Sequence, residues 1–189
     1  MDLDLYNENY DFVCSSMDKT DPKILEIGCG PGNITKYLLS KRPDFAVFGI
    51  DIAPNMIELA KANNPTARFQ VMDSREIDQI KTKYDAIVCG FCLPYLSPAD
   101  SRKLIGDCYD LLSENGLIYM SFVEGDPDRS GFQSGSSGER IYFYYYNLED
   151  LKTKFLQNKF QKLQIFKTEY KISKTQMDIH TILTARKKT

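Results

Sequence analysis

An acidic residue just before a run of alternating glycines is the first feature of this chain that could carry chemistry. The sequence from residue 24 is ILEIGCGPG, and its glycines are Gly28, Gly30 and Gly32. A glycine-rich turn between a strand and a helix lets the backbone approach a ligand closely, without identifying that ligand. Dinucleotide-binding turns have the spacing G-x-G-x-x-G, whereas Asn33 occupies the place of the third glycine here. The carboxylate of Glu26 repels a pyrophosphate and attracts an ammonium group.

Two further acids follow at the ends of the next two predicted strands. Asp51 lies 23 residues after Gly28, where a carboxylate can accept hydrogen bonds from both hydroxyls of a ribose. Asp73, with Ser74 beside it, can contact the exocyclic amine of an adenine. An amine, a ribose and an adenine together suggest S-adenosylmethionine as the ligand. The simpler alternatives are a tight turn for the glycines and helix caps for Asp51 and Asp73.

Cysteine and histidine residues offer weaker candidates. The chain has five cysteines, and Cys89 and Cys92 have the CxxC spacing of a redox or zinc pair. A zinc site needs four ligands, but there is no second pair and only one histidine, so we expect reduced structural thiols and no metal. That histidine, His180, suits a general base by its ordinary pKa, although a lone histidine on a strand is more often solvated or structurally hydrogen-bonded.

These residues need a scaffold of alternating strands and helices. Hydrophobic runs predict strands at 23–27, 46–50, 68–71, 84–89 and 117–123. Helical spacing begins at Asn33, after Pro54 and at Pro98, with Ser97 as the expected cap and Gly116 as the expected C-terminal glycine of the third helix. This alternation predicts a doubly wound, mainly parallel α/β sheet with ligands at the carboxyl ends of its strands.

The end of the chain predicts a different connection. A last helix is capped by Asn147, and two strands are expected at 163–170 and 177–185. Their connection, residues 171–176, is too short for the crossover that parallel neighbours need. We therefore expect an antiparallel hairpin to end the sheet.

Residues 124–146 interrupt the alternation. Four Gly and four Ser lie within 125–138, and five consecutive aromatic residues follow at 142–146. The composition predicts a mobile loop or lid. If the aromatic run is extended, alternate side chains point to opposite sides, so either Tyr142, Tyr144 and Tyr146 or Phe143 and Tyr145 face a ligand.

The composition limits the class of protein. A chain of 189 residues with 42% hydrophobic side chains predicts one domain. We expect a cytoplasmic protein, because there is neither a signal peptide nor an apolar run long enough to cross a membrane. With 24 basic and 26 acidic side chains, net charge -2, the chain lacks the basic excess of nucleic-acid-binding proteins. Ten basic and two acidic residues nevertheless fall in 151–189, a local charge of +8 that we expect to be a solvated face.

From about residue 23 to 123 the chain resembles the class I S-adenosylmethionine-dependent methyltransferase family. The resemblance rests on the glycine motif with Glu26, on Gly49-Ile50-Asp51, on Met72-Asp73-Ser74 and on YDAIV at 84–88. It implies a Rossmann-like sheet of seven strands, the last one antiparallel, with helices on both faces. The single domain 1–189 then divides into an N-terminal segment (1–22), a cofactor-binding core (23–123), a lid or substrate loop (124–146) and a final helix with hairpin (147–189).

The resemblance also implies a cofactor site. The glycine turn lies against the methionine part, Asp51 binds the ribose, Ile52 or Met56 packs on the adenine, and Cys89 lines the path to the sulfonium. The full set of implied cofactor-binding residues is Glu26, Gly28, Gly30, Gly32, Asp51, Ile52, Met56, Asp73, Ser74 and Cys89. Tyr6 and Tyr10 stand near the place of an Ala and Tyr pattern in small-molecule members of the family.

The acceptor side is less specific. Leu93-Pro94-Tyr95 follows the fourth strand, where enzymes that methylate nucleobase amines have Asn or Asp before Pro-Pro-aromatic; the polar residue and one proline are missing. This disfavours a nucleobase acceptor. Candidates for lining a substrate pocket are Tyr95, Tyr142, Tyr144 and Tyr146, and weak candidates for catalysis are Tyr95, Glu124 and His180.

Together these features predict a methyltransferase that moves the sulfonium methyl to an O, N, S or C nucleophile of a small molecule, as a monomer or homodimer without a metal. The donor is already activated, so positioning and desolvation carry most of the catalysis. The alternatives are an RNA or protein methyltransferase, favoured by the basic C-terminal part, a non-catalytic S-adenosylmethionine-binding module, and a dehydrogenase, which the glycine spacing opposes.

Overall fold

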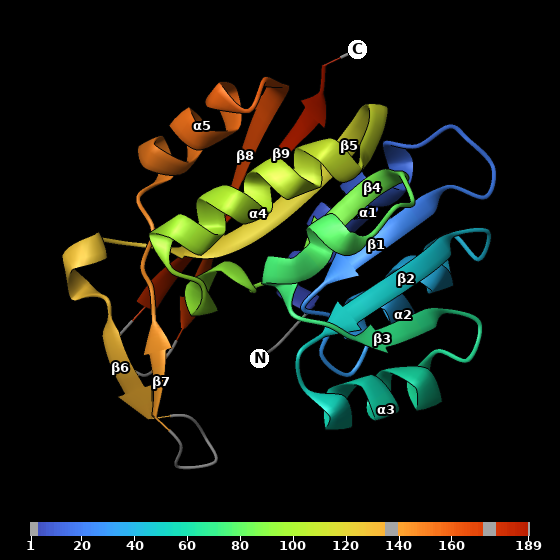
Figure 1. The fold of residues 1–189 in the computed structure, drawn as a ribbon, viewed down its shortest axis with the longest axis horizontal. Helices are drawn as coiled ribbons and strands as arrows, with labels where there is room; N and C mark the ends of the chain where they lie inside the picture. The colour runs from blue at the N-terminus through green and yellow to red at the C-terminus, as the bar shows by residue number, and fades with distance from the viewer. Residues whose placement is uncertain (1–3, 135–139, 172–176, 189) are drawn as a thin grey trace.

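The fold is built on one seven-stranded sheet with strand order β3-β2-β1-β4-β5-β9-β8 (Figure 1). The computed structural model describes residues 4–134, 140–171 and 177–188. The strands of this sheet are β1 (Lys23–Ile27), β2 (Ala46–Asp51), β3 (Arg68–Val71), β4 (Tyr84–Cys89), β5 (Leu112–Glu124), β8 (Phe160–Lys171) and β9 (Met177–Lys187). The first five are parallel, and β9 runs antiparallel to both β5 and β8. The predicted mainly parallel sheet with a terminal antiparallel hairpin is confirmed.

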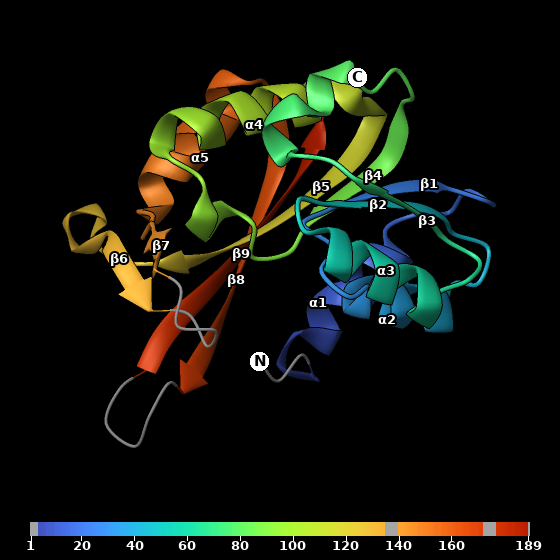
Figure 2. The same cartoon turned by 60° about the horizontal axis from the view of Figure 1, so that its bottom comes forward.

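Helices cover both faces of the sheet (Figure 2). They are α1 (Asn7–Ser15), α2 (Asn33–Lys41), α3 (Pro54–Asn63), α4 (Pro98–Leu111) and α5 (Leu148–Gln157). In Figure 2, α4 and α5 lie above the sheet and α1, α2 and α3 below it. Alternation along β1 divides its side chains between two cores: Leu25 belongs to the cluster under α4, and Ile24 to the cluster under α1 and α2. Glu26 is two residues from Ile24, so it faces the α1 and α2 side.

Two predicted helix caps form as the sequence suggests. The Ser97 hydroxyl accepts a hydrogen bond from the Asp100 N–H at 3.1 Å, and the Asn147 side chain accepts from the Glu149 N–H at 2.9 Å. The prediction for the end of α4 is wrong, because the helix ends at Leu111 and β5 begins at Leu112. Gly116 therefore lies within the strand. A Cβ atom there would come within 2.9 Å of a backbone oxygen, so close backbone packing explains this glycine.

The region predicted to be a mobile loop or lid contains two strands that the sequence analysis did not predict. Residues 131–134 (β6, Gly131–Ser134) and 140–143 (β7, Arg140–Phe143) form a separate two-stranded antiparallel sheet that projects from the body (Figures 1 and 2). Phe132 pairs with Tyr142 across the two strands, and their rings meet edge to face at 5.2 Å. This aromatic pair stabilises the hairpin. Part of the Gly/Ser run, 135–139, and most of the predicted connection 171–176 lie outside the described residues.

No helix within the described ranges has the length and apolar character needed to span a membrane.

Candidate functional site

The glycine turn joins β1 to α2 at the carboxyl end of the sheet. Gly28, Gly30 and Gly32 all have positive φ, at 69°, 51° and 80°, a region that non-glycine residues enter only at a cost. A Cβ on Gly32 would collide with the Asn64 side chain, and one on Gly28 would lie 3.2 Å from the Cβ of Cys92. A Cβ on Gly30 would meet nothing within 4 Å. The middle of the turn therefore borders open space where a ligand can lie against the backbone.

Glu26 lies behind this turn, fully buried. The Thr35 hydroxyl, from α2, donates a hydrogen bond to its Oε2. Its Oε1 is buried and has no hydrogen-bond partner among the residues that the structure describes. Burial raises the pKa of Glu26 to about 7, although the hydrogen bonds from Thr35 favour the carboxylate. A buried carboxylate oxygen without a donor is costly, and a ligand cation would relieve that cost.

Two tyrosines share the buried environment of Glu26. Strand register places Glu26 beside Val88 of β4, and Val88 beside Tyr119 of β5, so Glu26 and Tyr119 flank Val88 on one face of the sheet. Tyr10 of α1 packs on Tyr119 with ring centroids 5.7 Å apart. Burial, and secondarily the Glu26 charge, raise the pKa of Tyr10. No local pattern points to Tyr119, because strand register brings it near the turn.

Asp51 holds the turn from the end of β2. Its Oδ2 accepts a hydrogen bond from the Gly30 N–H at 2.9 Å, and its Oδ1 accepts one from the Ala53 N–H at 2.8 Å. A carboxylate can accept about four hydrogen bonds, so each oxygen keeps capacity for another donor. Ile52 beside it is 63% exposed, and Met56 is half-buried on α3. The carboxylate and an exposed apolar side chain thus lie next to the open middle of the turn.

Asp73 is more fully occupied than Asp51. It caps a short 3-10 helix by accepting from the Arg75 N–H at 2.9 Å, and it also forms an ion pair with the Arg75 guanidinium at 2.5 Å. The hydrogen bonds from Arg75 lower the pKa of Asp73. An adenine amine would have to share this carboxylate with Arg75. The Ser74 hydroxyl beside it accepts a hydrogen bond from the Cys92 thiol at 3.7 Å.

His180 lies at the same end of the sheet, but inside the protein. It pairs with Val123 near the end of β5, and its Nδ1 is 2.5 Å from the hydroxyl oxygen of Tyr6. Its ring stacks on Tyr170 at 4.5 Å and packs against Phe91 at 4.8 Å. Burial lowers the pKa of His180 to about 4, so the ring is neutral at neutral pH.

The other acceptor-side candidates are spread over the same end of the molecule. Tyr95 is 57% exposed and meets Phe143 edge to face at 6.0 Å. Tyr146 is buried, and its hydroxyl donates to the Leu96 carbonyl, whereas Tyr142 and Tyr144 are more accessible and pack on each other. The alternation predicted for this run therefore does not place all three tyrosines on one ligand face.

Glu124 is tied to the terminal hairpin. It accepts a hydrogen bond from the Thr181 hydroxyl at 2.6 Å and pairs with Lys167 at 2.8 Å. Burial opposes the charge of Glu124, but the bonds from Lys167 and Thr181 outweigh it and lower its pKa. Cys89 ends β4 and is fully buried in the core under α4.

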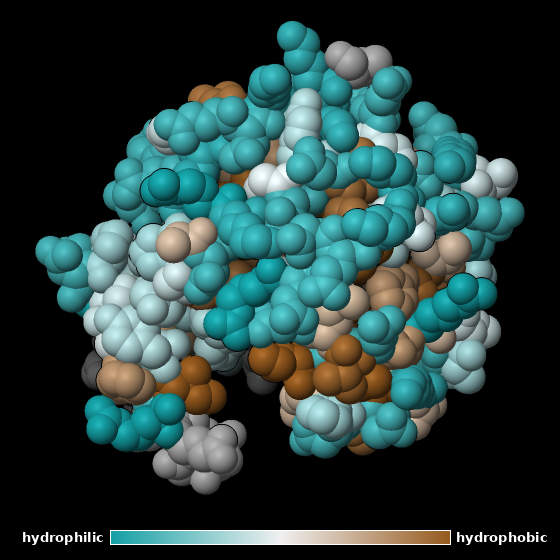
Figure 3. Space-filling model, in the orientation of Figure 1, coloured by the Kyte–Doolittle hydropathy of each residue, from teal (hydrophilic) through white to brown (hydrophobic). Residues whose placement is uncertain are grey.

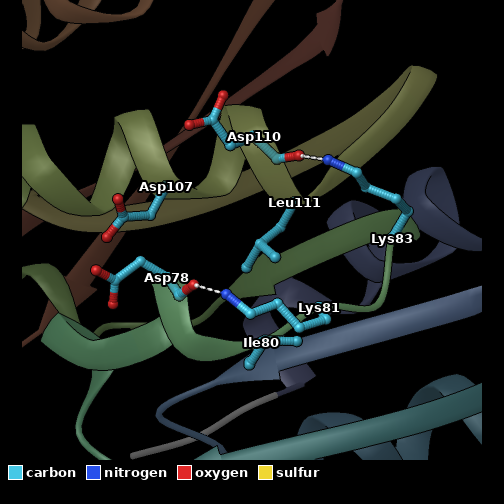
Figure 4. Close-up of a pocket in the computed structure, with 7 residues that line it drawn as sticks. All are labelled: Asp78, Ile80, Lys81, Lys83, Asp107, Asp110 and Leu111. Carbon is cyan, nitrogen blue, oxygen red and sulfur yellow. Dashed lines mark hydrogen bonds between the residues drawn. The ribbon is translucent and has the colours of Figure 1, made fainter.

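Two surface cavities differ in their relation to this site. A cavity of about 290 Å³ lies between the N-terminal segment and α2, and its lining includes Asn7, Tyr10, Asn33 and Lys36. It adjoins the glycine turn through Asn33. A second cavity of about 200 Å³ lies where residues 78–83 face the end of α4 (Figure 4). There Lys81 and Lys83 donate to backbone oxygens, as the dashed lines show. The lysines of this cavity therefore already have partners within the protein, and the cavity lies at the amino end of β4.

A family model described as a methyltransferase domain matches residues 24–116. This range holds the glycine turn, Glu26, Asp51 and Asp73, and the strand order of the sheet is that of the Rossmann-like methyltransferase fold. The chain belongs to the class I S-adenosylmethionine-dependent methyltransferase family. The resemblance found in the sequence motifs is confirmed.

Solved structures show how widely the methyltransferase fold is shared. An S-adenosylmethionine-dependent methyltransferase of Methanosarcina mazei superposes with a TM-score of 0.77 at 18% identity, covering 94% of this chain and 97% of the other. The 1,6-didemethyltoxoflavin-N1-methyltransferase of Burkholderia thailandensis, with bound 1,6-didemethyltoxoflavin and S-adenosylhomocysteine, gives 0.73 at 18% identity over 100% of this chain and 80% of the other. At this identity the likeness concerns the fold.

Among curated proteins, the malonyl-[acyl-carrier protein] O-methyltransferase of Acetivibrio thermocellus is 42% identical over 100 residues, which are 52% of this chain and 34% of the relative. The alignments of the first relatives span between about a third and a half of the relatives' own lengths, from 34% to 52%.

Proposed function

We propose that this protein binds S-adenosylmethionine at the carboxyl ends of β1 and β2 and transfers its methyl group to a small-molecule acceptor. The observation that carries the proposal is the joint arrangement of Glu26, the open face of Gly30 and Asp51. A buried carboxylate oxygen lacks a donor, the adjacent backbone borders open space, and a second carboxylate has capacity left on both oxygens. The Glu26 carboxylate fits an ammonium, the open backbone at Gly30 fits a chain that lies against it, and the Asp51 carboxylate fits a diol.

Each residue has a defined part in holding this donor. Glu26 would neutralise the ammonium, and Asp51 would accept the two ribose hydroxyls while it keeps the turn in place through Gly30. Ile52 and Met56 offer apolar surface to the adenine, and Asp73 with Ser74 offer polar atoms to its edge. When bound, S-adenosylmethionine supplies a methyl group on a sulfonium, a good leaving group. The protein then contributes position and exclusion of water.

The acceptor would enter where the ends of β4 and β5 meet the β6–β7 hairpin. Figure 3 shows a notch between that hairpin and the body, with hydrophobic side chains on both sides. Exposed hydrophobic residues of the hairpin are Phe132, Ile141 and Tyr142, and Tyr95 lies on the neighbouring segment. A mostly apolar opening with a few polar groups suits a small organic acceptor. Tyr144 and Tyr95 remain our candidates for lining it, with Glu124 and His180 as candidates for polar contact.

Calorimetry and label transfer test the proposal. We expect S-adenosylhomocysteine to bind in calorimetry, NAD not to bind, and Asp51→Ala to weaken the S-adenosylhomocysteine complex. Tight NAD binding without S-adenosylhomocysteine binding would refute the cofactor assignment. Labelled methyl from S-adenosylmethionine, supplied with a cell extract that is then fractionated, should enter metabolites. Label in RNA or protein alone would refute the small-molecule acceptor, and binding without any transfer would favour a non-catalytic module.

A further inference from the structure

Cys89 and Cys92 occupy two different environments at the end of β4. Cys89 is the last residue of the strand and is fully buried in the core under α4. Cys92 follows the bend at Gly90 and Phe91, directly before a short 3-10 helix (Leu93–Tyr95), and is half-buried. One member of the pair is thus partly exposed and the other is fully buried.

Cys92 forms part of the wall of the cofactor turn. Its Cβ would be 3.2 Å, and its Sγ 3.6 Å, from a Cβ built on Gly28. Its thiol donates a hydrogen bond to the Ser74 hydroxyl oxygen at 3.7 Å. Cys92 therefore fills the space between the turn after β1 and the residues after β3. A displacement of this sulfur therefore alters its contacts with both Gly28 and Ser74.

The ionisation of the two thiols is linked. A hydrogen bond from the Cys89 thiol lowers the pKa of Cys92 although burial opposes the charge, and the Ser74 hydroxyl adds to the lowering. The same bond, with burial, raises the pKa of Cys89. Burial instead raises the pKa of Cys14 to about 11, and it also raises the pKa of Cys108. Because the thiolate is the nucleophile, Cys92 is the thiol of this chain suited to react first.

We propose that Cys92 is an oxidation site and that it forms a disulfide with Cys89 which weakens cofactor binding. The Cys92 thiolate attacks one oxygen of a hydroperoxide, the O–O bond breaks, and a sulfenic acid forms as the alcohol or water leaves. The Cys89 sulfur then attacks the sulfenic sulfur, the S–S bond forms, and hydroxide departs and takes the Cys89 proton as water. Two thiols lose two electrons, and the peroxide gains them.

The bond between these cysteines requires movement at the cofactor turn. A disulfide, with an S–S distance of about 2 Å, is shorter than the hydrogen bond that already joins the two thiols, so the Cys92 sulfur must leave the Ser74 hydroxyl and move closer to Cys89. Phe91 between the two cysteines already has a φ of 55°, and its N–H donates to the Ser121 hydroxyl at 2.8 Å. The segment therefore starts from a bent backbone, and the movement of Cys92 withdraws the wall that supports Gly28. Loss of cofactor affinity follows, and this second half of the inference rests on the proposed function.

Mass spectrometry tests the oxidation step without reference to the cofactor. Treatment of the whole protein with hydrogen peroxide should lower its intact mass by about 2 Da, the loss of two hydrogens, and peptide mapping should join Cys89 to Cys92. Cys89→Ser should stop at a sulfenic acid that dimedone traps. The matched control Cys108→Ser should still form the bond. An unchanged mass, or the same loss in Cys92→Ser, would overturn the proposal.

Calorimetry with S-adenosylhomocysteine tests the effect of the disulfide on cofactor binding. We expect oxidised protein to bind it at least about tenfold more weakly than reduced protein, about 1.4 kcal/mol, with recovery after dithiothreitol. S-adenosylhomocysteine should in turn slow alkylation of Cys92 by N-ethylmaleimide. Equal affinity of reduced and oxidised protein overturns the effect on cofactor binding and leaves the proposed function intact. A disulfide in a protein whose reduced form does not bind S-adenosylhomocysteine overturns that effect and the proposed function, while the oxidation site stands.

Discussion

Cofactor binding should depend on pH through Glu26. Burial raises the pKa of this carboxyl to about 7 in the unliganded protein, and an ammonium ligand requires its charged form. Below pH 7 the Glu26 carboxyl must lose one proton for each ligand that binds, so the affinity should fall about tenfold for each unit by which the pH is lowered. Between pH 8 and pH 5 the expected loss is about 90-fold, or roughly 3 kcal/mol. Calorimetry of S-adenosylhomocysteine across this range measures it directly.

The matched control is Glu26→Gln, which keeps the shape and removes the titration. It should bind more weakly at pH 8 and lose most of the dependence between pH 5 and 8. Stability gives a second measurement. Because the folded-state pKa is raised, the native protein binds more protons than the unfolded chain between about pH 4.5 and 7, so its stability falls as pH rises through that window, by about 3 kcal/mol. A wild-type affinity that is flat from pH 5 to 8 would refute the reasoning.

Three further results are expected. Asp51→Ala removes the acceptor of the Gly30 and Ala53 hydrogen bonds and the proposed ribose ligand, so it should weaken S-adenosylhomocysteine binding about 100-fold by calorimetry. Asp73→Asn should weaken it less than about tenfold, because Arg75 already engages the Asp73 carboxylate. Gly30→Ala places a methyl group at φ 51° beside open space and should lower the free energy of unfolding, measured with denaturant, by about 1 kcal/mol. It should weaken S-adenosylhomocysteine binding by more than that. Unchanged affinity would contradict our placement of the ligand against Gly30. The NMR signal of His180 should titrate near pH 4 in the folded protein. The stability should fall as the pH drops from about 6.5 toward 4, because the unfolded chain binds the proton first. A titration midpoint near 6.5 in the folded protein would contradict the burial of His180.

Local patterns were enough to predict most of the sheet. The runs at 23–27 and 84–89 are β1 and β4 with the same bounds, because strands buried on both faces appear as continuous apolar segments. The start of β5 was missed because the apolar stripe of α4 continues into Leu112, and residues 113–115 are polar. The hairpin β6–β7 was missed for a different reason. Its pairing depends on contacts between Phe132 and Tyr142 across a Gly/Ser run, which composition alone does not reveal.

The candidate site shows the same division between local and distant signals. Glu26, the glycines and Asp51 lie within one strand-turn-helix-strand segment, so their spacing identified them. Their hydrogen-bond partners are local as well, whereas the aromatic groups near Glu26 and the partner of His180 come from elsewhere in the chain. Tyr119 reaches the neighbourhood of Glu26 through two steps of strand register, and Tyr6 meets His180 across 174 residues of sequence. Arg75 is also local, and a basic residue two positions after Asp73 could have been recognised as its ion-pair partner.

The basic C-terminal part also has a structural explanation that the sequence did not supply. Lys187 donates to the carbonyls of Tyr109 and Leu112 at 2.8 and 2.9 Å, near the end of α4. Arg186 donates to the Ser16 carbonyl after α1 at 2.7 Å, and Lys167 pairs with Glu124. These charges hold the terminal hairpin to the helices and to β5 on both faces of the sheet. Because these three charges are each engaged by a separate partner within the protein, they do not act together as a surface for a phosphate backbone.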